Sequence, residues 1–91
     1  MPQLNGEIHH IGQPKKVTDN FTKVEFIVVT DKNTKYPQYI QLYLANQKMD
    51  LIKDFREGQQ VSVDYNLQGR LDKNDNTKCF NQLQAYKIQR V

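Results

Sequence analysis

Residues 58–88 constrain the fold more than any other part of this 91-residue chain. From Val61 to Gln68, apolar and polar side chains alternate strictly along the sequence. That period of two is typical of a β-strand with one face in a core and the other in water. Gly69 continues the apolar phase, where a glycine often marks a bend or a close backbone approach. After a polar run, residues 79–88 read as a second strand, so we expect the last hairpin of a small β-protein.

Size and composition predict a single domain that spans residues 1–91. A chain this short has a small core unless its sheet closes or a partner covers it. Hydrophobic residues make up only 37% of the chain, but they recur at regular spacing, which argues against disorder. The net charge of +3 permits an anionic partner such as a nucleic acid.

The sequence also predicts a cytoplasmic protein. Its single cysteine, Cys79, cannot form an internal disulfide, which fits a reducing compartment. The first residues lack the charged and apolar regions of a signal peptide. The longest uninterrupted apolar stretch, Phe26 to Val29, is far too short to span a membrane, so no membrane partner is expected.

Three strands are expected in the first half of the chain. Residues 4–11 form the first, with a phase shift near His9 and His10 that suggests a bulge. Residues 12–16 contain Gly and Pro and read as its frayed end or a loop. The second and third strands are residues 21–30 and 38–44. The aromatic side chains expected in the core are Phe21, Phe26, Phe55 and Tyr65.

The period then changes, and residues 46–55 show helical spacing. Asn46 is a candidate N-cap, and Gly58 lies just beyond the end. With the two strands of the final hairpin, joined by a polar loop at residues 72–77, the predicted order is β-β-β-α-β-β. This all-β class with one short helix fits a five-stranded OB-fold barrel, in which a helix sits between strands three and four. An SH3-like barrel lacks that helix, and a ferredoxin-like fold needs two.

No residue pattern indicates catalysis. His9 and His10 are neighbours on a strand, so they point to opposite faces and cannot chelate one metal ion. Cys79 has no C-x-x-C partner, and no phosphate-binding loop, serine-hydrolase or zinc-protease motif occurs. We therefore expect no enzymatic activity, no metal site and no cofactor.

The outward-facing residues suggest a binding surface instead. In residues 38–44, alternation places Tyr39 and Tyr43 on the face opposite the aliphatic side chains, outside the expected barrel. In the last strand, Phe80 and Tyr86 share one face, and Lys23 points outward from the second strand. Exposed rings for bases and cations for phosphates are what single-stranded nucleic acids require.

The candidates fall into two groups by chemistry. For base stacking they are Tyr36, Tyr39, Tyr43, Phe80 and Tyr86. For contacts with phosphates they are Lys15, Lys16, Lys23, Lys35, Arg70, Lys73 and Lys78. Because subunit interfaces also favour aromatic residues, the same rings could instead cover a contact between copies of the chain. Both interpretations stay open.

The residues of the final hairpin carry a family resemblance. The stretches Glu57–Leu71 and Phe80–Ile88 resemble the last strands of bacterial single-stranded DNA-binding proteins, which have the OB-fold. From Leu4 to Ile88 the chain is similar to a family of short uncharacterised bacterial and phage proteins of that fold; Phe21 and the segment 36–38 also carry this likeness. The bacterial proteins stack bases on tryptophan, and this chain has none, so Tyr and Phe would take that role.

The resemblance implies non-sequence-specific binding of single-stranded DNA in replication, recombination or repair. The chain is expected to act as a homo-oligomer, a dimer or higher. Two alternatives remain at this point: an RNA-binding OB-fold protein, or an oligomerisation module that binds no nucleic acid.

Overall fold

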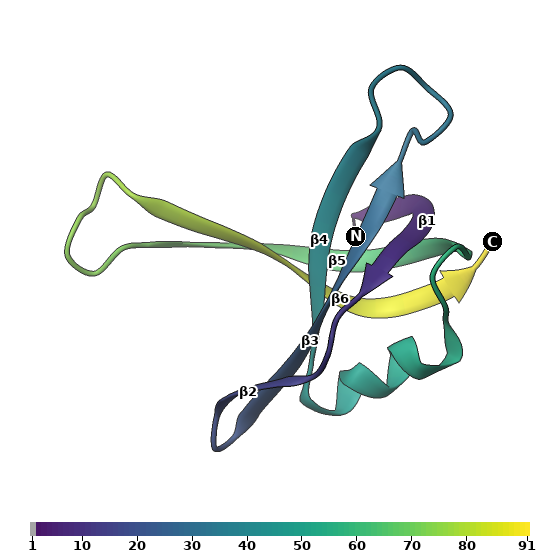
Figure 1. Cartoon of the computed structure of the whole chain (residues 1–91). Helices are drawn as coiled ribbons and strands as arrows, with labels where there is room; N and C mark the ends of the chain where they lie inside the picture. The colour runs from purple at the N-terminus through teal and green to yellow at the C-terminus, as the bar shows by residue number, and fades with distance from the viewer. Residues whose placement is uncertain (1) are drawn as a thin grey trace.

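The computed structural model describes residues 2–91, which form a mostly β structure with one short helix, as predicted (Figure 1). Within that range no helix is long and apolar enough to cross a membrane. The elements, in chain order, are β1 (Gln3–Ile11), β2 (Lys15–Thr18), β3 (Phe21–Thr30), β4 (Gln38–Ala45), the 3-10 helix η1 (Asn46–Asp54), β5 (Gln60–Leu71) and β6 (Cys79–Arg90).

Five of the strands form a closed sheet in the order β1-β5-β6-β4-β3, because β1 pairs with both β5 and β3. The first half of β1 pairs with β5 and the second half with β3, and the register shifts between Ile8 and His10. This confirms the phase shift expected at His9 and His10. A bulge bends a strand, so the irregularity lets one strand serve two partners.

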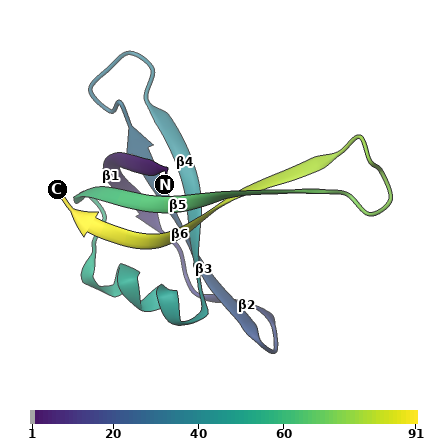
Figure 2. The same ribbon diagram turned by 180° about the vertical axis from the view of Figure 1, so that it is seen from behind.

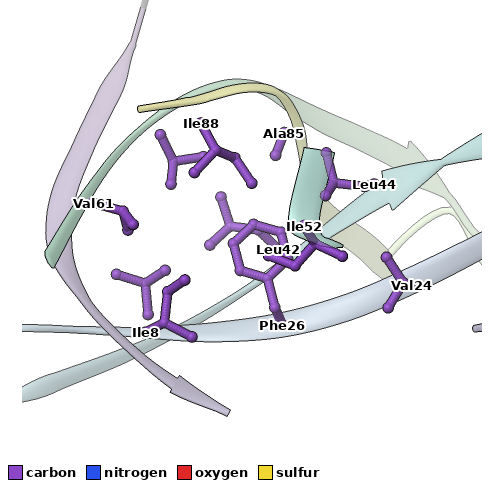
Figure 3. Close-up of a cluster of buried hydrophobic side chains, with 11 residues drawn as sticks. Ile8, Val24, Phe26, Leu42, Leu44, Ile52, Val61, Ala85 and Ile88 are labelled. Carbon is purple, nitrogen blue, oxygen red and sulfur yellow. The ribbon is translucent and has the colours of Figure 1, made fainter. Parts of the chain in front are cut away.

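The core fills the inside of the closed sheet (Figure 3). The predicted alternation is clearest in β3, where Val24, Phe26 and Val28 are buried and the residues between them are half-buried. The largest fully buried side chains are Ile8, Phe26, Val28, Leu42, Leu44, Val61 and Val63, each 1% exposed or less. The aromatic residues Phe55 and Tyr65 pack against this core from its margin. Phe21 is the exception: it is half-buried and lies outside the core cluster.

Helix η1 lies where a helix was predicted and contacts β3, β4 and β6 at one end of the closed sheet (Figure 1). Ile52 is its buried residue. The N-cap prediction is wrong, because Ala45 holds that position and Asn46 has a left-handed backbone with φ of 51°. The chain turns sharply there, and asparagine tolerates that conformation better than most residues. The Asn46 Oδ1 accepts a hydrogen bond from the backbone N–H of Thr22 at 3.0 Å.

The extra strand β2 corrects the prediction of a frayed end or loop at residues 12–16. Residues 15–18 pair antiparallel with the start of β3, on the side of the sheet away from β4. The turn between them contains Asp19 and Asn20, residue types that favour tight turns. All four residues of β2 are exposed, so no burial pattern marked it as a strand.

Two hairpins extend beyond the closed sheet on the same side of the molecule in both views (Figures 1 and 2). One is the β2–β3 hairpin. The other is the outer half of β5 and β6, which stay paired as far as Leu71 and Cys79. We call residues 67–83 the arm. It projects as a two-stranded ribbon well past the core.

Burial predicts a large loss of stability for one phenylalanine of this chain when it is replaced by alanine, and a small loss for another. Phe26 is fully buried, whereas Phe80 on the arm is 49% exposed. Phe26→Ala should lower the free energy of unfolding by about 3–5 kcal/mol, the usual cost of removing a core aromatic ring. Phe80→Ala should lower it by about 1 kcal/mol or less, as expected for a surface position. Denaturant unfolding measures both, and equal losses would contradict the assignment of the core.

Candidate functional site

An open hollow of about 550 Å³ lies between the β2–β3 hairpin and the arm. Five strands contribute to it, so residues far apart in the sequence meet there. We call this hollow the groove. Its lining residues are Val17, Thr18, Phe21, Lys23, Tyr43, Gln68, Gly69, Arg70, Phe80 and Gln82. Four of the residues predicted from the sequence, Lys23, Tyr43, Arg70 and Phe80, are among them.

Tyr43 lines the groove but is only 8% exposed. Its hydroxyl donates a hydrogen bond to Oε1 of Gln68 at 2.6 Å, and the Lys23 ammonium lies 5.6 Å from the ring centroid. The prediction of an exposed ring is therefore wrong. Tyr43 does point out of the core, but Lys23 and the arm cover that part of the outer face.

The arm supplies an aromatic and a basic side chain to the groove. Arg70 and Phe80 are directly opposite each other in the β5–β6 ladder, so their side chains share one face. Both also line a second, neighbouring hollow of about 360 Å³, which includes Lys73. The two hollows share Arg70 and Phe80, and Leu71 also lines the second one, which lies toward the tip of the arm.

A pair of like charges lies at the opposite wall: Lys23 lines the groove, and Lys15, which is not among the lining residues, is its neighbour on β2. Lys15 on β2 is directly opposite Lys23 on β3. Like charges in this position destabilise a β-ladder. Among residues 2–91, neither lysine nor Arg70 has a carboxylate within ion-pairing distance, whereas Lys16 pairs with Asp19 at 3.8 Å. The groove thus has cations on both walls that no side chain of the chain neutralises, and an anion would relieve their repulsion.

Turn chemistry fixes the tip of the arm. Asp75 Oδ1 accepts hydrogen bonds from the hydroxyl of Thr77 at 2.5 Å and from its backbone N–H at 2.9 Å. These two bonds, the hydroxyl bond first, hold the pKa of Asp75 below its ordinary value of 3.8. The carboxylate therefore stays ionised, and its hydrogen bonds stay in place, until the pH falls below that value. Lys78 lies in the same turn and donates its backbone N–H to Asp75 O at 3.2 Å.

The remaining predicted residues lie away from the groove. Tyr39 is on the same strand as Tyr43 but about 13 Å further along, at roughly 3.3 Å per residue, and its ring meets His9 edge-on at 5.0 Å. Lys35 and Tyr36 lie in the β3–β4 loop, where the Lys35 ammonium is 6.0 Å from the Tyr36 ring. Tyr86 is half-buried at the irregularity in the β5–β6 ladder. The structure does not bring these side chains together with the groove.

Sequence reasoning missed other groove residues. The sequence predicts a core position for Phe21 and no functional role for Val17 or Gln68, yet all three line the groove. Gln68 follows the same strand phase as Arg70, which was the available signal for it. Its amide links two elements, because its Nε2 donates to Oε1 of Gln84 on β6 at 2.7 Å while its Oε1 accepts from Tyr43. For Val17 no signal existed without knowledge of β2.

The opposite face of the arm is apolar. Leu67 and Leu71 are 69% and 60% exposed, and their ladder partners on β6 are Leu83 and Cys79. We call these four residues the leucine stripe. Elsewhere, no group of three His, Cys, Asp or Glu side chains that could hold a metal ion occurs within residues 2–91.

Fold and groove together define a class: a small closed-sheet β-protein with a cationic groove between two projecting hairpins. The family model for a domain of unknown function, DUF3127, matches residues 3–89, so the chain belongs to that family. No curated protein matches the chain.

Proposed function

We propose that this protein is an OB-fold protein that binds single-stranded DNA without sequence specificity, in replication, recombination or repair. The closed five-stranded sheet with a helix before its last hairpin supports the OB-fold assignment. OB-folds bind oligonucleotides beside the loops after their first and fourth strands. In this chain those loops are the β2–β3 hairpin and the arm, which enclose the groove.

The observation that carries the proposal is the exposed ring of Phe80 among cations that have no carboxylate partner within residues 2–91. Phe80 lies beside Arg70 on the arm, and Lys23 faces them from β3. A base that stacks on an aromatic side chain gains about 1–3 kcal/mol, and the flanking phosphates need cations. Single strands present unstacked bases, whereas a duplex keeps its bases paired and stacked. The groove therefore suits single strands.

Neither stacking nor phosphate contact requires a particular base. That supports binding without sequence specificity. The 2′-hydroxyl is the group by which proteins distinguish RNA from DNA. The titration below should therefore be repeated with an RNA oligonucleotide of matched length. Tighter binding of RNA than of DNA would replace DNA with RNA in this proposal.

The salt dependence of binding tests the role of the cations. If Lys15, Lys23, Arg70 and Lys73 each contact one phosphate, the log–log salt slope for oligo-dT should be near −3, from roughly −0.7 per phosphate. Arg70→Ala should make this slope shallower by about 0.7. Lys35→Ala in the β3–β4 loop removes the same charge outside the groove and should leave the slope unchanged. Fluorescence titration at several salt concentrations measures all three, and no binding at low salt would refute the proposal.

Stacking is tested separately by a matched pair of aromatic variants. Phe80→Ala should weaken oligo-dT binding by about 1–3 kcal/mol, the value of one stacked base. Tyr36→Ala removes an exposed ring outside the groove, 71% exposed, and should leave affinity unchanged. If the two variants weaken binding equally, or if Phe80→Ala binds like the wild type, the groove is not where bases stack.

The leucine stripe favours a second candidate function, an oligomerisation module. The interface first expected at Tyr39 and Tyr43 is wrong for Tyr43, which its own chain buries. Leu67 and Leu71 are instead the exposed apolar side chains of the arm's opposite face, and a second copy of this chain is the occupant we propose.

Light scattering tests this candidate. The wild type should form a dimer or larger assembly at micromolar concentration, and Leu71→Gln should shift it toward monomer by removing apolar contact area. Val17→Gln changes an exposed apolar residue in the groove and should leave the assembly intact. A monomeric wild type would refute the oligomerisation module without touching the DNA proposal.

A further inference from the structure

Tyr43 occupies the one position where β4 and β6 pair. Within residues 2–91 the ladder between these two strands consists of Tyr43 and Gln84, whereas β5 and β6 are paired over almost their whole length. The closed sheet is therefore joined most weakly at the point from which the arm projects. Contacts between side chains therefore have to hold β4 and β6 together where the backbone ladder does not.

The side chain of Tyr43 meets both walls of the groove. Its hydroxyl donates to Oε1 of Gln68 on the arm at 2.6 Å, and Nε2 of Gln68 in turn donates to Oε1 of Gln84 on β6, next to the base of the arm, at 2.7 Å. On the other side, the ammonium of Lys23 on β3 lies 5.6 Å from the ring centroid. One residue thus contacts the wall that carries Phe80 and the wall that carries Lys23.

We infer that Tyr43 is a positioning residue, which braces the arm at the separation from β3 at which Phe80 and Arg70 act together with Lys23 on one bound strand. This inference rests on the proposed function. It replaces the stacking role expected for Tyr43, because a ring that is only 8% exposed offers no face to a base.

The need for a brace follows from the shape of the arm. A two-stranded ribbon without further cover is marginally stable in water. A ligand that contacts both walls must then order the arm when it binds, and that ordering lowers affinity. A hydrogen bond that fixes the arm beforehand removes part of this cost. The Tyr43 hydroxyl should accordingly affect binding without touching the strand.

Tyr43→Phe tests the inference, since it removes the hydroxyl and keeps the ring beneath Lys23. A typical hydrogen bond contributes about 0.5–1.5 kcal/mol, so oligo-dT binding should weaken by roughly 2- to 12-fold. Amide hydrogen exchange in residues 67–71 and 79–83 should accelerate by a similar factor, with little change in the β1 and β3 amides. Tyr39→Phe, on the same strand outside the groove, should change neither.

A double variant separates positioning from a general loss of stability. If the hydroxyl acts through Gln68, Tyr43→Phe should have no further effect on arm exchange or affinity in a Gln68→Leu background. Additive effects would overturn the inference. So would wild-type arm exchange in Tyr43→Phe, or faster exchange with unchanged affinity. If the wild type binds no oligonucleotide, the proposed function is wrong, and the exchange experiment alone decides whether Tyr43 braces the arm.

Discussion

The structure depends on the double pairing of β1, which joins β5 with one half and β3 with the other. This pairing closes the sheet and encloses a core that a chain of this size could not otherwise shield from water. Gly6 lies near the crossover, where an added Cβ would sit 2.5 Å from the carbonyl oxygen of Val29. A side chain there would push β1 away from β3. The bulge after Ile8 and this glycine are thus the local features on which closure rests.

Closure also sets the position of the groove. Two antiparallel pairs, β2–β3 and β5–β6, are longer than the closed part of the sheet and leave it on the same side (Figures 1 and 2). Their outer residues have no core to cover, so the polar, basic and aromatic side chains there are free for other contacts. The arm differs between its two faces: Arg70 and Phe80 border the groove, while the leucine stripe faces away from it. The two candidate functions therefore use different faces of the arm, which meet at Leu71 in the second hollow.

Sequence reasoning predicted those features that follow from local periodicity. The alternation in β3, β4 and β5 identified the core because a half-buried strand repeats every two residues. Strand β2 was missed because all of its residues are exposed and its pairing depends on the length of β3. The burial of Tyr43 was also missed, since the residue that covers its hydroxyl, Gln68, is 25 positions later in the chain. Coverage by a projecting hairpin is a tertiary property, and strand phase alone gives only the direction in which a side chain points.

The most direct measurement is an NMR titration of the ¹⁵N-labelled protein with a short oligo-dT, in which every backbone amide reports on its surroundings. If the two hairpins hold a single strand, chemical shifts should change along both walls of the groove, in residues 15–23 on one side and 68–70 with 80–82 on the other. Amides near Tyr36 and Tyr39 should stay unchanged. Shifts confined to the β3–β4 loop, or changes along the leucine stripe without changes in the groove, would contradict the central claim that the two hairpins hold a single strand between them.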